Sequence, residues 1–247
     1  MDKPTLLVTP SDTANSAERW YELAIYLSRQ LDIPFKLDTA IDMADFRKRL
    51  PSSSLAYVPP QEVTRLTSTH NFMPLCRPDD CYEEVVLVSS IHATDKNLQG
   101  FNGTVIAGIA GSFPNRLGLT LLKKKGIHPA SVANKESWLQ VLKALQQQEQ
   151  HYALLSKSFL SELNALSKSN IQVIASSKTQ KAFSLFMLNP CLTDSYAALE
   201  NALLTMHHHD AGKDVLSRHG LANWTSVADD ELDKMTKLLG RKPQGKQ

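Results

Sequence analysis

The segment from Asn97 to Ile127, NLQGFNGTVIAGIAGSFPNRLGLTLLKKKGI, constrains the fold most, because it predicts a strand, a small-residue loop and an amphipathic helix in that order. Residues 104–107 are β-prone, and residues 116–125 have a helical periodicity that ends at Gly126. The loop between them exposes backbone N–H groups at a helix start, where the helix dipole favours an anion. The sequence leaves open whether this loop is a ligand cradle or only a turn of an α/β protein.

Strands and helices alternate on both sides of this segment, which is typical of an α/β protein with parallel strand pairs. Before it, we expect strands at 6–8, 33–37, 55–58 and 84–89, and helices at 15–31, 42–50 and 62–67. After it, residues 132–133 are short and apolar, and we expect strands at 152–155, 171–174 and 183–187, and helices at 137–147, 159–166, 195–207, 212–219 and 229–239. We therefore predict an α/β protein with two lobes, each a mixed sheet flanked by helices, and a ligand cleft between them. Lobe 1 would comprise residues 1–88 plus 175–247, and lobe 2 residues 89–174.

Composition excludes several classes of partner. The net charge of +2 and the scattered basic residues indicate neither a nucleic-acid partner nor a membrane surface, and no run of 18 apolar residues could span a bilayer. The first residues lack a basic region followed by an apolar run, so we expect either a cytoplasmic protein or a periplasmic one whose signal peptide was removed and Met1 added. Cys76 and Cys81 either close a small disulfide loop in an oxidising compartment or stay reduced, with Cys191 left over.

The sequence does not predict an enzyme. His207, His208 and His209 are consecutive, and consecutive side chains on a helix point about 100° apart, so the three do not hold one ion from one face. No Ser-His-Asp or Cys-His arrangement stands out, and Glu83 and Glu84 are interpreted as solvated carboxylates. We expect no catalytic residue, no metal site and no cofactor.

Three stretches resemble parts of a known family: ERWYELAIYLSRQLDIPFKL, SSSLAYVPPQEVTRL and YEEVVLVSSIHATDKNLQGFNGTVIAGIAGSFPNRLGLTLLKKKGI. They look like its first helix and second strand, its third strand, and its crossover strand with the ligand-binding strand, loop and helix. The tail DAGKDVLSRHGLANWTSVADDELDKM is similar to its closing helices. The family is that of the phosphate, phosphite and phosphonate substrate-binding proteins of ABC importers, which have the type II periplasmic binding fold.

The resemblance implies a set of ligand-binding residues at strand ends and helix starts, where open α/β sheets bind ligands. Carried over position by position, the set is Ser11, Asp12, Tyr57, Ser112, Asn115, Ser156 and Ser158. Two of these have a second interpretation, because Tyr57 is either a ligand contact or a packed strand aromatic, and Asp12 is either a ligand partner or a helix cap.

One loop departs from the family's pattern. The family's loop before the second-lobe helix is rich in Ser and Thr, whereas residues 110–115 here read AGSFPN. One hydroxyl remains, a phenylalanine has entered, and Pro114 removes an N–H donor. A less charged or partly apolar ligand therefore fits this loop better than a phosphonate.

Two functions are compatible with this reading. The first is a periplasmic solute-binding protein that closes around a small molecule by hinge motion and presents it to an ABC permease. The second is a sensory domain of the same fold that passes closure to a signalling partner. In both cases we expect a monomer.

Overall fold

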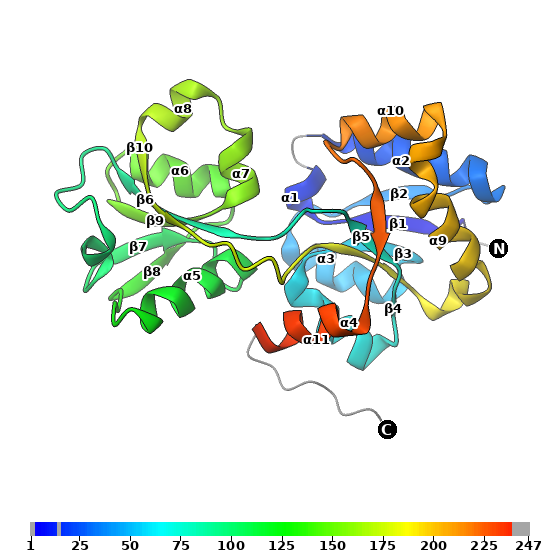
Figure 1. The fold of residues 1–247 in the computed structure, drawn as a ribbon, viewed down its shortest axis with the longest axis horizontal. Coiled ribbons are helices and arrows are strands. Elements are labelled where there is room, and N and C mark those ends of the chain that lie inside the picture. The colour runs from blue at the N-terminus through cyan, green and yellow to red at the C-terminus, as the bar shows by residue number, and fades with distance from the viewer. Residues whose placement is uncertain (1–2, 14–15, 239–247) are drawn as a thin grey trace. The chain divides into compact units, whose positions relative to one another are not determined.

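The computed structural model describes residues 3–13 and 16–238 and divides them into two compact units (Figure 1). Of these residues, the first unit comprises those up to Cys81 and Phe183–Met235, and the second comprises Tyr82–Ala182 and residues 236–238. The lobe boundaries predicted from the sequence stay a prediction. In the part of the chain that the structure describes, no helix is both long and apolar enough to cross a membrane.

The first unit is built on a five-stranded mixed sheet in the order β2-β1-β3-β11-β4. The strands are β1 (Thr5–Val8), β2 (Lys36–Thr39), β3 (Leu55–Val58), β4 (Met73–Pro74) and β11 (Leu185–Leu188). β1 pairs in parallel with β2 and β3, and β11 runs antiparallel to β3 and β4. The carboxyl ends of β1, β2 and β3 therefore lie at one edge of this sheet.

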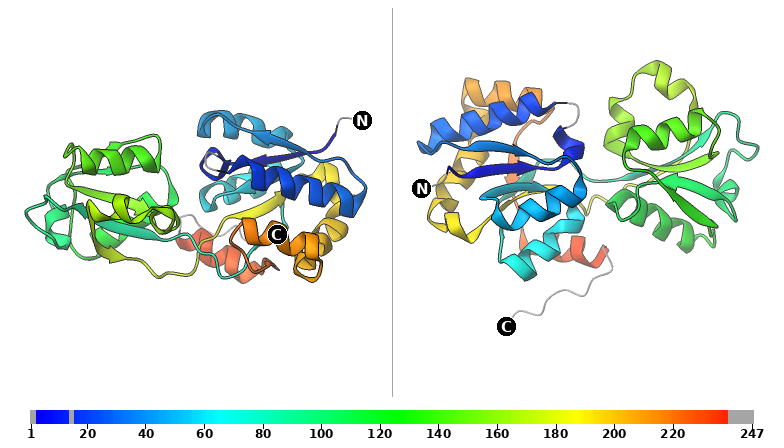
Figure 2. Two further views of the ribbon diagram at one scale, coloured as in Figure 1. Left: turned by 90° about the horizontal axis from the view of Figure 1, so that it is seen from above. Right: turned by 180° about the vertical axis from the view of Figure 1, so that it is seen from behind.

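Helices cover both faces of the first sheet, because each central strand is apolar on both sides. The helices are α1 (Pro10–Thr13), α2 (Ala17–Leu31), α3 (Met43–Arg49), α4 (Pro60–His70), α9 (Tyr196–Leu204), α10 (Asp210–Arg218) and α11 (Asp229–Leu238). α2, α9 and α10 pack on one face, where they share a core with Leu6 and Tyr57, and α3 and α4 lie on the other (Figure 2). The predicted helix start at Asn15 lies outside the described residues.

A short two-stranded sheet of β5 (Cys76–Pro78) and β12 (Trp224–Ser226) completes the first unit. Its register pairs Arg77 with Thr225, which joins segments far apart in the chain. Cys76 is fully buried, and it is not joined to Cys81 by a disulfide bond.

The second unit has its own five-stranded mixed sheet, in the order β10-β6-β9-β7-β8. Its elements are β6 (Val85–Ser90), β7 (Val105–Gly108), α5 (Phe113–Lys124), β8 (Ser131–Asn134), α6 (Trp138–Gln146), β9 (Tyr152–Ser156), α7 (Lys157–Glu162), α8 (Ala165–Ser169) and β10 (Ile171–Ser176). β7 pairs in parallel with β8 and β9, whereas β6 is antiparallel to β9 and β10. The carboxyl ends of β7, β8 and β9 again share one edge.

Several local expectations differ from the structure. The helix expected at 116–125 begins at Phe113, and the helix expected at 159–166 is two helices, Lys157–Glu162 and Ala165–Ser169. Glu84, predicted to be a solvated carboxylate, is only 3% exposed. The helix predicted to run to His207 ends at Leu204, and Met206–His208 forms a short 3₁₀ turn. The next helix begins at Asp210 rather than Gly212, since the segment turns between the two helices.

Candidate functional site

At the edge of the first sheet, the residues that follow β1 form a small hydrogen-bonded cluster. Thr9 Oγ1 donates to Asp12 Oδ2 at 2.6 Å, so it accepts the hydrogen bond that joins it to Ser11 Oγ at 2.9 Å. Trp20 Nε1 donates to the Asp12 carbonyl oxygen at 3.1 Å and fixes the turn against α2. Ser11 is exposed and Asp12 is half-buried. The sequence reasoning found these two residues but missed the buried Thr9, which orients both.

Tyr57 lies on β3, next to β1, and its ring is part of an aromatic cluster in the core. The ring centroid lies 4.8 Å from that of Trp20, 5.1 Å from that of Phe186 and 6.1 Å from that of Trp224. Only 8% of Tyr57 is exposed. A ligand stacked on its ring would have to displace one of these neighbours, so contact through stacking is disfavoured and the ligand role of Tyr57 stays a prediction.

Several amides of the loop between β7 and α5 in the second unit, and of the start of α5, donate hydrogen bonds to other groups of the protein. The Ala110 amide donates to Asn134 Oδ1 at 2.7 Å, at the carboxyl end of β8. Ser112 Oγ donates to the Ile109 carbonyl oxygen at 2.8 Å and accepts from the Asn115 amide at 3.3 Å, which makes Ser112 the N-cap of α5. Sequence reasoning missed Asn134. Its Oδ1 accepts the Ala110 amide, which is therefore not available to donate to a bound anion.

Asn115 is the most unusual polar residue of this loop. It is only 4% exposed, and its Oδ1 has no hydrogen-bond partner among the described residues. A Cβ atom added to Gly108 would lie 2.4 Å from that Oδ1, so the glycine at the end of β7 is what admits the amide. A buried, unsatisfied acceptor costs about 1–3 kcal/mol, which makes this oxygen a candidate partner for a ligand that donates a hydrogen bond.

Ser156 and Ser158 lie together at the carboxyl end of β9, where α7 begins. Their Oγ atoms are 2.7 Å apart, with Ser156 buried and Ser158 exposed. The Lys157 amide between them donates to the Glu84 carbonyl oxygen at 3.0 Å. Each unit thus gathers its own predicted residues at the carboxyl edge of its sheet.

The histidine side chains pack in two places. The described residues include no group of three or more His, Cys, Asp or Glu side chains that could hold a metal ion. His207 and His208 stack on each other with ring centroids 3.9 Å apart. His219 packs edge-on against Trp20, and burial, with a smaller contribution from the nearby Arg19 charge, lowers the pKa of His219 from 6.5 to about 4.

Comparisons with known proteins agree with this architecture. The sequence profile of the family described as "ABC transporter, phosphonate, periplasmic substrate-binding protein" matches residues 6–232. The chain is similar to PhnD1 from Prochlorococcus marinus in complex with methylphosphonate, with 14% identity and a TM-score of 0.80 over 96% of this chain and 98% of that chain. It is also similar to a binding protein component of an ABC phosphonate transporter from Pseudomonas aeruginosa, with 13% identity and a TM-score of 0.81 over 96% and 86% of the two chains.

A more distant likeness is to the periplasmic aliphatic sulphonate binding protein SsuA from Escherichia coli, with 13% identity and a TM-score of 0.63 over 98% of this chain and 75% of that chain. At these identities the structural likeness shows the fold, which is that of the type II periplasmic binding proteins. No curated protein matches the chain.

Proposed function

Because this chain belongs to the family of periplasmic substrate-binding proteins of phosphonate ABC transporters, we propose that it captures a small molecule between its two lobes and delivers it to an ABC-type importer. The polar side chains at the carboxyl edges of both sheets support this proposal, since open α/β sheets bind ligands there. The proposed contacts are Ser11, Asp12, Tyr57, Ser112, Asn115, Ser156 and Ser158.

The bound molecule is less charged than a phosphonate, or partly apolar. The observation that carries this part of the proposal is the internally bonded loop between β7 and α5. A phosphonate needs several N–H or O–H donors, whereas the amides of Ala110, Ser112 and Asn115 already donate within the protein and Pro114 has none to give. Ala110 is exposed and Ile109 is half-buried, which adds apolar surface beside the loop.

Transport would follow from hinge closure. A solute that contacts both lobes stabilises the closed form by its differential affinity for that form, and the permease would recognise the closed form. The family acts in the periplasm, and we place this chain there as a monomer without a cofactor. The sensing alternative stays a prediction. Co-purification with a permease would support transport, and co-purification with a signalling protein would support sensing.

A thermal-shift screen tests the ligand class. Phosphate, phosphite and methylphosphonate form one arm, and neutral or amphipathic organic compounds form the other. A compound present at about 100 times its dissociation constant adds about 2.7 kcal/mol to the free energy of unfolding. We expect stabilisation only in the organic arm. Stabilisation by the oxyanions would contradict the inferred ligand class and leave the binding role in place.

A matched pair of variants tests whether the loop contacts the ligand. Ser112 and Ser137 are both N-cap serines whose Oγ accepts an amide at 3.3 Å, in α5 and α6 respectively. Ser112→Ala and Ser137→Ala should each lower stability by about 1 kcal/mol. Only Ser112→Ala should also weaken binding of the best compound from the screen. Equal binding by the two variants would exclude Ser112 as a contact.

A further inference from the structure

Two of the segments that connect the units are held by buried charged side chains. The chain passes from the first unit to the second between Cys81 and Tyr82, returns between Ala182 and Phe183, and passes again between Met235 and Thr236, within α11. The two segments pair with each other where the Glu83 amide donates to the Ala182 carbonyl oxygen at 2.7 Å. Asp80 on one segment and Gln180 on the other have positive φ angles, of 51° and 50°. A left-handed backbone at a residue other than glycine is uncommon, so each segment has a marked bend at this position.

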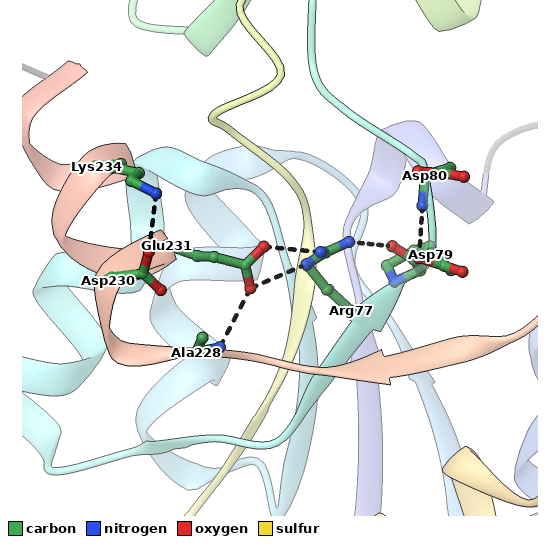
Figure 3. Close-up of polar contacts among 8 residues, drawn as sticks. Arg77, Asp79, Asp80, Ala228, Asp230, Glu231 and Lys234 are labelled. Carbon is green, nitrogen blue, oxygen red and sulfur yellow. Dashed lines mark hydrogen bonds and ion pairs between the residues drawn. The ribbon is translucent and has the colours of Figure 1, made fainter.

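The first charged side chain, Arg77, belongs to the first unit and joins three segments (Figure 3). Its Nη2 donates to Glu231 Oε1 at 2.7 Å and its Nη1 to the Pro78 carbonyl oxygen at 3.0 Å. Its guanidinium carbon lies 4.9 Å from the centroid of the Phe183 ring, on the returning segment. The Arg77 side chain is 9% exposed, so a break in this ion pair would leave a buried cation without its carboxylate.

Glu231 extends this contact to the last helix. It lies in the first turn of α11, and its Oε2 also accepts from the Ala228 amide at 3.1 Å. The neighbouring Asp230 turns away to solvent, where it pairs with Lys234 at 2.8 Å (Figure 3). The start of α11 is therefore tied through Arg77 to both connecting segments, and Asp230 is not part of that tie.

The second charged side chain, Glu84, belongs to the second unit. It lies on the outgoing segment and binds residues of the returning segment. Its carboxylate accepts from Ser177 Oγ, from Thr179 Oγ1 at 3.1 Å and from the Gln180 amide at 2.7 Å. Ser177 Oγ in turn accepts from the Val85 amide at 2.9 Å. Hydrogen bonds to a charged group are worth about 1.5–3 kcal/mol, so this network resists local bending of the segments it holds.

We propose that these two clamps, Arg77–Glu231 with Phe183 and Glu84 with Ser177, Thr179 and Gln180, set the limits of the hinge. Bending is confined to residues 80–83 and 181–182, and α11 is a functional part of the hinge because it supplies Glu231. The proposal rests on the proposed function, since it assumes that the lobes close on a solute. It assigns Arg77, Glu84 and Glu231 as positioning residues that do not touch the solute.

The test uses amide hydrogen exchange of the full-length protein without ligand, so it does not depend on whether any solute binds. Glu231→Gln keeps the size of the side chain and removes its charge, and Asp230→Asn is the matched control on the same turn of α11. Loss of a charge-assisted pair should speed exchange of the Asp79 and Glu83 amides by about tenfold in Glu231→Gln and leave them unchanged in Asp230→Asn.

A second arm tests the clamp in the other unit. Glu84→Gln should speed exchange of the Gln180 amide, which donates to the carboxylate, because a neutral amide oxygen is a weaker acceptor. If Glu231→Gln loses its fold, shown by faster exchange in β1 and β9 as well, Arg77→Lys replaces it, since lysine keeps the charge but not the planar fork over Phe183. If Glu84→Gln loses its fold, Thr179→Val replaces it, since valine removes one donor to the Glu84 carboxylate.

A distance measurement separates a hinge role from simple fraying of α11. Spin labels attached without cysteine chemistry at Lys48 and Lys123, one exposed position in each unit, report the distribution of distances between the units. We expect a broader distribution in Glu231→Gln and in Glu84→Gln than in Asp230→Asn. Unchanged distributions in both variants, or exchange in Glu231→Gln equal to that in Asp230→Asn, would overturn the proposal. Failure of every compound in the screen would refute the solute-binding function without changing these two results.

Discussion

Lowering the pH from about 7.5 to about 4.5 is expected to destabilise the first unit through His219, whose ring must stay neutral to remain packed against Trp20. The ring centroids of the two residues are 4.7 Å apart, and His219 Nε2 lies 3.1 Å from the Arg19 carbonyl oxygen. Burial and the Arg19 charge lower the pKa of His219 in the folded protein from 6.5 to about 4. Between these two pH values the unfolded chain binds a proton that the folded chain does not bind, so stability falls as the pH falls.

The magnitude follows from the two pKa values. The difference between 6.5 and about 4, at about 1.4 kcal/mol for each pH unit, corresponds to about 3 kcal/mol. This stability is fully present above pH 6.5 and is lost progressively as the pH falls towards 4. A loss of this size is a large fraction of the 5–15 kcal/mol that is roughly typical of whole proteins.

Urea unfolding at a series of pH values, followed by tryptophan fluorescence, measures the effect against a variant. His219→Gln keeps a side-chain donor for the Arg19 carbonyl oxygen but has no group that titrates in this range. The stability difference between the natural protein and His219→Gln should shrink by about 3 kcal/mol from pH 7 to pH 4. Arg19→Gln removes the smaller of the two causes, so it should raise the pKa of His219 only part of the way back to 6.5. An NMR titration of the ring measures this pKa. A difference that stays constant with pH would refute the reasoning.

Two further predictions concern the backbone. Gly108→Ala should lower the free energy of unfolding by about 1–3 kcal/mol, because the new Cβ would lie 2.4 Å from Asn115 Oδ1. In a double-mutant cycle measured by urea unfolding, Asn115→Ala added to Gly108→Ala should recover part of that loss. Gln148→Gly should raise the free energy of unfolding by about 0.5–1 kcal/mol, because Gln148 follows the end of α6 with a φ of 59°, a conformation that glycine adopts without a Cβ penalty. A lower thermal midpoint in Gln148→Gly would contradict this second expectation.

Local patterns predicted the elements well where one short segment carries the signal. The β-prone runs at 6–8 and 55–58 form β1 and β3, whereas the helix expected at 116–125 begins earlier, at Phe113, because Ser112 caps it. The strand expected at 33–37 begins three residues later, at Lys36. The reason is tertiary, because the Phe35 amide donates to Ser28 Oγ on α2, whereas the Lys36 amide donates to the carbonyl oxygen of Pro4, the residue before β1.

The ligand role of the candidate site stays a prediction, and only the position of its residues at strand ends can be compared with the structure. Ser11, Asp12, Ser112 and Asn115 are polar residues that follow apolar strands, and that pattern is visible in a single sequence. The internal bonding of the loop is not visible in this way, since the acceptor for Ala110 is Asn134, 24 residues later. Which donors remain for a ligand therefore depends on the pairing of β7 with β8.

The sequence by itself determined the alternation of strands and helices and the family resemblance, because these depend on neighbours within a few turns of chain. The tertiary structure decided which charged side chains are buried and which groups they bind. Glu84 meets Ser177 across 93 positions, and Arg77 meets Glu231 across 154. A charged residue becomes buried only when distant segments supply its hydrogen bonds, and that supply exists only after the two sheets and α11 have come together.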